Sequence, residues 1–156
     1  YREMALDMVR PGLLLYGLYP GAERGGLDLK PVMTVLTRVS EITEHRAGDT
    51  ISYGRTFTCE RDMRLAVIPV GYADGLPRRL SGVMDVLING RRAREVGTIC
   101  MDMCMVDITG MDDVRVGDVV TVFGQGLSVD EQAAKAGTIS YELLCAVSPR
   151  VPRVYV

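Results

Sequence analysis

From residue 31 onward, hydrophobic and polar positions alternate over short runs, which is typical of half-buried β-strands. Met33, Val35 and Val39 fall on one face of the first such strand. Thr34 and Arg38 fall on its other face. Further runs of this kind cover residues 64–70, 84–88, 98–108, 119–123 and 150–156. The pattern therefore predicts a chain that is mainly β.

Turn sequences separate these runs. Residues 46–50 (RAGDT) and residues 115–119 (RVGDV) have the same form, and each leads into an apolar run. The Asn89-Gly90 pair is typical of a two-residue hairpin turn. Repeated Gly-Asp turns between short strands predict a small antiparallel barrel or sandwich.

Both ends of the chain have helical patterns. Apolar residues recur at helical spacing over residues 2–9. Ser128 and Glu131 have the spacing of a capping box, and Gly137 is expected to end the short helix that follows. Ser140 is expected to cap a second helix. The predicted fold class is thus a mainly β, barrel-like or sandwich-like domain with short helices at both ends.

A linker divides the chain near its start. Residues 21–26 (GAERGG) have the composition of a flexible connection, and the sequence becomes rich in Val, Ile, Thr and Met after residue 31. We therefore divide the chain into residues 1–25 and residues 26–156. Because it begins at Tyr1 in a helical pattern, without a methionine, we expect it to be a piece of a longer protein.

Composition and charge narrow the function classes. The 156 residues are 47% hydrophobic and 24% charged, which is ordinary for one globular domain. The net charge of -2 argues against binding to nucleic acid or to a membrane surface, because both usually need a basic excess. No apolar run is long enough to span a bilayer, and no secretory leader opens the chain, so we expect a cytoplasmic protein.

The cysteines give no sign of a metal site. Cys59, Cys100, Cys104 and Cys145 lack the close paired spacing of a zinc site, and the chain has one histidine, His45. We therefore expect buried, reduced thiols and no metal.

The first candidate for chemistry is Tyr53, in the run ISYGRTFT at residues 51–58. A phenol titrates near pH ~10 in water, so it serves as a proton donor or acceptor only where neighbouring cations lower its pKa. Arg55 falls on the same side if the strand continues, and Gly54 permits another chain or a ligand to approach closely. From these residues alone, Tyr53 is either a catalytic group or an ordinary packing residue.

Two further features also have two interpretations. Arg10 stands beside the Pro11-Gly12 pair, which either opens a short helix whose free N–H groups bind an anion or forms an ordinary loop. Asp102 lies inside an apolar run, where a carboxylate needs a partner. It therefore belongs either to a structural pair or to a functional site.

Together, five segments resemble the carboxy-terminal part of alanine racemase. This pyridoxal-phosphate enzyme interconverts L- and D-alanine for bacterial cell-wall synthesis. In chain order the segments are RPGLLLYGLYP (10–20), SYGRTF (52–57), PVGYADGLPR (69–78), CMDMCMVD (100–107) and SPRVPRVY (148–155). The resemblance covers nearly the whole chain.

The resemblance implies a domain organisation. The family has an amino-terminal (β/α)8 barrel that holds the cofactor, followed by a mostly β domain. Residues 1–25 match the last part of the barrel with the linker, and residues 26–156 match the carboxy-terminal β domain. The family's Schiff-base lysine belongs to the start of the barrel and has no counterpart here. We therefore expect this chain to be inactive alone.

The resemblance also implies roles for residues near the reacting atoms. Tyr53 matches the second catalytic base, which exchanges the Cα proton on the face opposite the lysine, while the cofactor is the electron sink. Arg10 matches the partner of the pyridine nitrogen. Gly12 and Leu13 match residues whose N–H groups hold the cofactor phosphate.

Substrate contacts follow in the same way. Met101 matches a position whose backbone contacts the substrate carboxylate, and Asp102 matches an acidic position near the site mouth. Tyr72 and Arg78 match residues that line the substrate corridor. Because the β domain of one subunit completes the barrel site of the other in this family, we expect a head-to-tail homodimer.

Three positions depart from the family pattern. Thr98 stands where many relatives have a corridor arginine, and Met103 replaces a frequent glutamine. Pro149 stands where some relatives have a tyrosine that reaches the cofactor phosphate. Two alternatives stay open: a serine or broad-specificity racemase of the same architecture, and a β-barrel binding module without catalysis.

Overall fold

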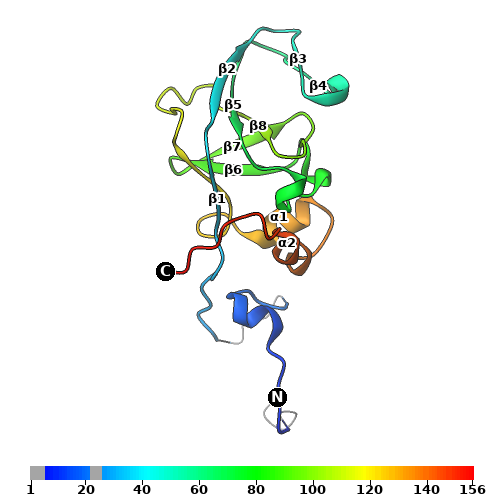
Figure 1. Ribbon diagram of the computed structural model, residues 1–156, viewed down its shortest axis with the longest axis vertical. Coiled ribbons are helices and arrows are strands. Elements are labelled where there is room, and N and C mark those ends of the chain that lie inside the picture. Colours follow the sequence, from blue (N-terminus) through cyan, green and yellow to red (C-terminus); the bar gives the residue numbers. More distant parts are fainter. Residues whose placement is uncertain (1–5, 22–25) are drawn as a thin grey trace.

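A curled antiparallel sheet of seven strands forms the body of the molecule (Figure 1). The computed structural model describes residues 6–21 and 26–156. The strands are β1 (Val35–Arg38), β2 (Glu41–His45), β5 (Met63–Ile68), β6 (Asp85–Ile88), β7 (Arg91–Val96), β8 (Cys104–Asp107) and β9 (Val119–Phe123). Their order across the sheet is β1-β9-β6-β7-β8-β5-β2.

The two edge strands, β1 and β2, follow each other directly in the chain. Between them, the Val39 N–H donates to the Asp118 carbonyl, and the Ser40 N–H donates to the Val67 carbonyl, each at 2.9 Å. The chain therefore crosses from one edge of the sheet to the other, and this crossing curls the sheet into a half-barrel. The predicted mainly β, barrel-like fold is confirmed.

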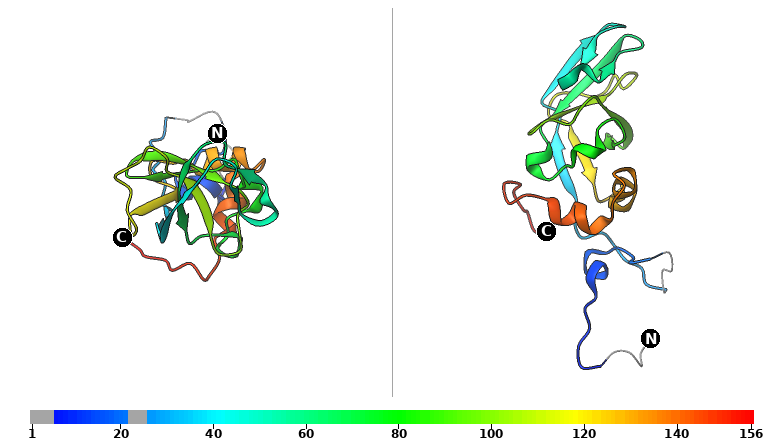
Figure 2. Two further views of the ribbon diagram at one scale, coloured as in Figure 1. Left: turned by 90° about the horizontal axis from the view of Figure 1, so that it is seen from above. Right: turned by 90° about the vertical axis from the view of Figure 1, so that its right-hand side faces the viewer.

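The remaining elements are short. β3 (Thr50–Ile51) and β4 (Phe57–Thr58) form a two-stranded hairpin at one end of the molecule, and α1 (Val129–Lys135) and α2 (Ser140–Ala146) pack at the other end of the half-barrel (Figure 1). In the described part of the chain, the 3-10 helices are η2 (Gly12–Tyr16), η3 (Tyr53–Arg55), η4 (Tyr72–Asp74) and η5 (Arg78–Leu80). The segment with η2 lies beyond α1 and α2, so the molecule is elongated (Figure 2).

The two Gly-Asp turns have the same hydrogen bonds, as their shared sequence predicts. Asp49 Oδ2 accepts the N–H of Arg46 at 2.7 Å, and Asp118 Oδ2 accepts the N–H of Arg115 at 3.0 Å. The predicted hairpin is also present between β6 and β7, where Asn89 has a φ of 51°. Local sequence thus determines these turns, because each depends on side chains and glycines inside the turn itself.

Alternation along the strands produces the core. In β6 the side chains of Val86 and Ile88 are fully buried, and in β8 those of Cys104 and Val106 are fully buried. A second, smaller cluster lies under the β3–β4 hairpin and contains Ile51, Cys59, Met63, Leu65 and Val96. Burial of apolar area at about 25 cal/mol per Å² anchors the hairpin to the half-barrel.

Three predicted strands differ from the structure. Within residues 98–108 only Cys104–Asp107 is a strand, and the residues before it form a loop. Residues 51–58 are interrupted by η3, and residues 150–156 contain no strand. At the last of these, the Arg153 guanidinium donates to the Ser148 carbonyl at 2.5 Å and to the Val147 carbonyl at 2.8 Å, which curls the chain instead of extending it.

The helix predictions were right in position and partly wrong in detail. Ser128 caps α1, but it accepts from the Asp130 N–H at 3.1 Å, and Glu131 does not complete a capping box. Glu131 instead accepts from Arg92 Nη2 at 2.7 Å. Ser140 is inside α2 rather than its cap and donates to the Asp130 carboxylate. Of the helix expected over residues 2–9, residues 2–5 lie outside the described residues, and residues 6–9 are not helical.

Two further predictions concern the linker and the thiols. Residues 22–25 of the expected linker lie outside the described residues, so the division at residues 21–26 stays a prediction. All four cysteines are free, but only Cys59 and Cys104 are buried, and Cys145 is exposed. None of the helices in the described part of the chain has the length and hydrophobicity needed to cross a bilayer.

Candidate functional site

A hollow of ≈ 710 Å³ opens between the β3–β4 hairpin, the segment with η4 and η5, and the loop before β8. Its lining residues are Ser52, Tyr53, Tyr72, Arg78, Thr98, Ile99, Cys100, Met101, Asp102 and Met103. The structure therefore brings together Tyr53, Tyr72, Arg78, Met101 and Asp102, which are five separate predictions from the sequence.

Tyr53 projects from a strained turn rather than from a strand. Its side chain is 75% exposed. Ser52 and Arg55 have φ values of 66° and 51°, in the left-handed region that L residues rarely occupy. The expectation that Arg55 lies on the same strand face as Tyr53 is therefore wrong, because the alternation stops at β3. Backbone strain of this kind persists only where the surroundings hold it, and it is common at functional sites.

The Tyr72 turn is fastened to the backbone of the Met101 loop. The Tyr72 N–H donates to the Cys100 carbonyl at 3.1 Å, and the Ala73 N–H donates to the Met101 carbonyl at 2.9 Å. At Gly71 a Cβ atom would lie 2.4 Å from the Cys100 carbonyl oxygen, so no other residue fits without movement. These contacts fix the two walls of the hollow relative to each other.

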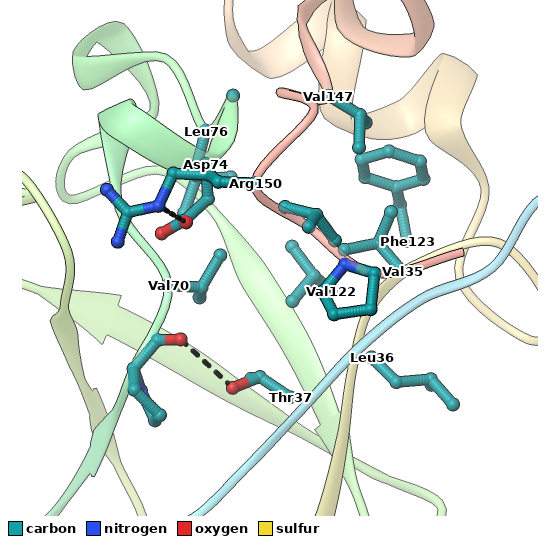
Figure 3. A pocket seen from close by; sticks show the side chains of 14 residues that line it. Val35, Leu36, Thr37, Val70, Asp74, Leu76, Val122, Phe123, Val147 and Arg150 are labelled. Atoms are coloured by element: carbon teal, nitrogen blue, oxygen red, sulfur yellow. Dashed lines mark hydrogen bonds and ion pairs between the residues drawn. The ribbon is translucent and has the colours of Figure 1, made fainter. Parts of the chain in front are cut away.

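A carboxylate fastens the same turn from its other end. Asp74 Oδ2 accepts the Gly71 N–H at 2.9 Å, and Asp74 Oδ1 pairs with Arg150 Nε at 3.1 Å. Figure 3 shows this ion pair beside a second, smaller hollow of ≈ 230 Å³. The Ser148 N–H also donates to the Asp74 carbonyl at 3.0 Å. The chain end after α2 is thus tied to the turn with Tyr72.

The mouth of the large hollow is mostly apolar. Tyr53, Tyr72, Met101 and Met103 have exposed side chains. Asp102 is exposed as well, outside β8, so the energetic cost expected for a carboxylate inside an apolar strand does not arise. A cluster of exposed aromatic and methionine side chains is typical of a surface that another molecule covers.

The predicted phosphate-binding residues do not reach this hollow. Arg10, Gly12 and Leu13 lie on the segment with η2, at the end of the molecule opposite the β3–β4 hairpin (Figures 1 and 2). The predicted short helix after Pro11 is present as η2. Within one chain, the two halves of the predicted site are therefore far apart.

Sequence reasoning missed Tyr141, on α2. Its hydroxyl oxygen accepts the Leu13 N–H at 3.2 Å, although 128 residues separate the two in the chain. A Cβ atom at Gly12, where φ is 57°, would lie 2.6 Å from the same hydroxyl. No local signal predicts this contact, because Tyr141 reads as an ordinary helical residue.

A second missed residue is Glu95, in β7. Its side chain is fully buried, and one carboxylate oxygen accepts the Gly82 N–H. The other oxygen, Oε1, has no hydrogen-bond partner among the residues that the structure describes. Burial raises the pKa of Glu95 to about 7, while the Gly82 N–H and the Arg94 charge oppose the rise. Glu95 stands between the exposed Arg94 and the buried Val96, so alternation along the strand does not predict that its carboxylate is buried.

Comparison with known proteins identifies the family. A model of the alanine racemase carboxy-terminal domain matches residues 32–155. The chain belongs to the alanine racemase family. It is 48% identical over 160 residues to alanine racemase 1 of Clostridium acetobutylicum, covering 99% of this chain and 42% of that protein. It is 48% identical over 159 residues to the alanine racemase of Desulforamulus reducens, covering 100% of this chain and 43% of that protein.

Solved alanine racemases have the same fold. The biosynthetic alanine racemase of Pseudomonas aeruginosa superposes with a TM-score of 0.89 at 43% identity, over 95% of this chain and 42% of that chain. The alanine racemase of Bartonella henselae, solved with covalently bound pyridoxal phosphate, gives a TM-score of 0.90 at 36% identity, over 96% of this chain and 42% of that chain. The chain thus spans 42% of the length of each of these two racemases.

The residues present fit one end of the family's cofactor. At the start of η2, the turn at Gly12 and the Tyr141 hydroxyl form a small polar cradle suited to a phosphate. No lysine is among the residues that line the hollow, so none of them would anchor the aldehyde of the cofactor. The two lysines are Lys30 and Lys135, and Lys135 is engaged by Asp85 at 2.5 Å. These residues support contact between the chain and the cofactor phosphate, but they do not make up a complete cofactor site.

Proposed function

We propose that this chain is the carboxy-terminal part of an alanine racemase and that it supplies Tyr53 as the base for one face of the amino acid. The activity is the interconversion of L- and D-alanine with pyridoxal phosphate, in the cytoplasm and for peptidoglycan synthesis. The chain alone is inactive, because it has no lysine to anchor the cofactor.

One observation supports this proposal above the others. Tyr53 and the Gly12–Leu13 turn lie at opposite ends of one chain, so they cannot serve the same site within it (Figure 1). Two copies arranged head to tail would bring the Tyr53 end of one against the Gly12 end of the other. The exposed Tyr53, Tyr72 and Met101 side chains would then be covered by the partner subunit.

The chemistry required of Tyr53 follows from stereochemistry. Inversion at Cα needs an acid–base group on each face, within hydrogen-bond reach of the proton. Tyr53 presents an exposed phenol on a backbone that Thr98 and Ser52 hold in place, and Arg78 lines the same hollow as a cation. Tyr53 thus removes or returns the proton on one face. When bound, the pyridoxal group withdraws electrons from Cα.

The other predicted roles divide between the two ends of the chain. At the η2 end, Arg10 would face the pyridine nitrogen, and Gly12, Leu13 and Tyr141 would hold the phosphate. An arginine does not give up its proton, so the ring nitrogen would stay largely unprotonated. The Tyr141 hydroxyl would supply a donor at the phosphate, which Pro149 cannot do.

The remaining residues act on the substrate at the hollow. The Met101 backbone would contact the alanine carboxylate, while Tyr72, Arg78 and Asp102 line the path by which the amino acid enters. The Met101 carbonyl is already used by Ala73, so its N–H is the group that suits an anion.

The experiment that tests the proposal is a mixing assay. The pure chain is added to a separately expressed amino-terminal part that binds pyridoxal phosphate, and D-alanine formation is followed. We expect activity only on mixing and its loss with Tyr53→Phe. Tyr155→Phe is the matched control, because Tyr155 is exposed near the chain end and lies outside the hollow. Turnover by the pure chain would contradict the inactive state that we propose.

The whole racemase gives a sharper test of Tyr53. With Tyr53→Phe we expect Cα–H exchange into heavy water to fall far more from one enantiomer of alanine than from the other. Equal losses from both enantiomers would argue against a one-face base. Serine, offered in parallel, distinguishes an alanine enzyme from a broader racemase, and no activity with any amino acid in the whole protein would favour a binding module.

A further inference from the structure

We propose that Thr98 is a positioning residue for Tyr53, and that its buried hydroxyl holds the Tyr53 turn in the orientation that proton transfer requires. This inference rests on the proposed function of Tyr53 and concerns how that side chain is held. Thr98 itself is 7% exposed, whereas the Tyr53 side chain is 75% exposed.

Thr98 contacts the Tyr53 turn at three places. Its Oγ1 atom donates to the Tyr53 carbonyl at 3.4 Å and lies 2.9 Å from Thr56 Oγ1. Its carbonyl accepts the Ser52 hydroxyl at 2.6 Å. Thr98 therefore binds the turn before, at and after the tyrosine. It does so from a loop that lies 42 to 46 positions later in the chain than its partners.

The turn needs such support because its backbone is strained and its ladder is short. Ser52 has a φ of 66° and Arg55 a φ of 51°. β3 and β4 pair through two residues each, so few backbone hydrogen bonds oppose relaxation of the turn. Side-chain hydrogen bonds from outside the hairpin then decide which way Tyr53 points.

The hydroxyl of Thr98 has one arrangement that satisfies all its contacts. It donates its proton to the Tyr53 carbonyl, so it accepts from the Thr56 hydroxyl. Valine has the same shape but provides neither function, whereas serine provides both. The pair Thr98→Val and Thr98→Ser therefore separates the hydroxyl from the packing of the side chain.

The loop beneath the turn adds a steric contribution. A Cβ atom at Gly97, where φ is 84°, would lie 2.8 Å from Ser52 Cβ. The chain at residue 97 thus approaches Ser52 as closely as a glycine permits. The next residue, Thr98, makes the hydrogen bonds to the turn. Their position beside Cys100 and Met101 links the base to the wall that would meet the substrate carboxylate.

The test compares Thr98→Val with Thr98→Ser in the whole racemase with pyridoxal phosphate bound. For Thr98→Val we expect kcat to fall about tenfold, because reacting groups that lose alignment lose rate rather than ground-state binding. KM for alanine should change less than about twofold. The loss should fall on Cα–H exchange from the same enantiomer that Tyr53→Phe impairs. Thr98→Ser should restore most of kcat.

Two controls address a general effect on folding. Thr37→Val removes a comparable side-chain bond, from Thr37 Oγ1 to the Pro69 carbonyl at 3.2 Å, outside the large hollow. It should leave kcat unchanged. Thr56→Val removes the hydrogen bond between the Thr56 and Thr98 hydroxyls by changing the other partner. It should lower Cα–H exchange from the same enantiomer, but more weakly, so the proposal is testable even if Thr98→Val folds poorly.

The double variant Tyr53→Phe with Thr98→Val decides between the two proposals. If Thr98 acts through Tyr53, adding Thr98→Val to Tyr53→Phe should lower kcat little below that of Tyr53→Phe alone. Full additivity, equal losses from both enantiomers, or no recovery with serine would each overturn the role of Thr98. An unchanged rate for Tyr53→Phe alone would instead overturn the proposed function of the tyrosine.

Discussion

Arg150 Nε lies 3.1 Å from Asp74 Oδ1, so the last segment of the chain is joined by an ion pair to the turn with Tyr72 (Figure 3). The Asp74 side chain is 15% exposed and the Arg150 side chain 54% exposed. Because the Arg150 side chain is half-exposed, water screens the pair, and it is worth at most about 1 kcal/mol as an isolated contact. Its larger effect is geometric, because the same carboxylate also accepts the Gly71 N–H.

The first prediction concerns this pair. Asp74→Asn keeps an acceptor for Gly71 but removes the charge that attracts Arg150. In the whole racemase we expect KM for alanine to rise several-fold, with kcat nearly unchanged, because Tyr72 lines the entry path rather than the reacting atoms. Steady-state kinetics measure both values. Asp113→Asn is the control, since Asp113 forms a surface pair with Arg91 away from both hollows.

A second prediction concerns the contact of Gly71 with the Met101 loop. Gly71→Ala places a Cβ atom 2.4 Å from the Cys100 carbonyl oxygen, so the two walls of the hollow must move apart. Overpacking of this kind costs about 1–3 kcal/mol of folding free energy, and we expect a urea midpoint lowered accordingly. Gly21→Ala is the control, because nothing lies within 4 Å of its added Cβ. Equal midpoints for the two variants would contradict the tight contact.

The sequence predicted most of the fold where local signals agree with tertiary structure. Residues 119–123 were predicted as a strand and form β9 with the same bounds. Here the turn at Asp118 and the alternating run after it both predict a strand that begins at Val119. The Asn89-Gly90 hairpin is a similar case. Failures occurred at Ser52 and Arg55, whose positive φ values do not follow from the alternating pattern, and the Ser52 hydroxyl is held by the distant Thr98 carbonyl.

The candidate site divides in the same way. Tyr53, Tyr72 and Met101 were assigned through resemblance, and the structure places them around one hollow. The Tyr141 contact with Leu13 joins residues 128 positions apart, so no periodicity or spacing predicts it. Asp102 was placed in a strand by its alternating neighbours, but the loop before β8 ends that alternation.

The third prediction concerns Tyr141. Tyr141→Phe removes the oxygen that accepts the Leu13 N–H, along with the phenolic donor that we propose for the cofactor phosphate. We expect the dissociation constant of pyridoxal phosphate to rise about tenfold, since one hydrogen bond to a charged group is worth about 1.5 kcal/mol or more. An absorbance titration of the whole apoenzyme measures this value. Tyr155→Phe should bind the cofactor as the unmodified protein does.

The last prediction concerns the buried acid Glu95. Burial raises its pKa from 4.5 to about 7, so between these values the folded chain holds a proton that the unfolded chain releases. The free energy of unfolding must then fall as pH rises through this window and reach its highest contribution below pH 4.5. Each pKa unit is worth about 1.4 kcal/mol, so the whole change is about 3 kcal/mol.

Glu95→Gln removes the titrating group while keeping an oxygen for the Gly82 N–H. We expect the variant to lose this fall in stability, and to be more stable than the unmodified chain above about pH 7.5, where the latter must bury a charge. Urea unfolding at a series of pH values measures the slope. The exposed Glu60→Gln is the control and should keep it. A slope that persists in Glu95→Gln would mean that another group binds the proton on folding.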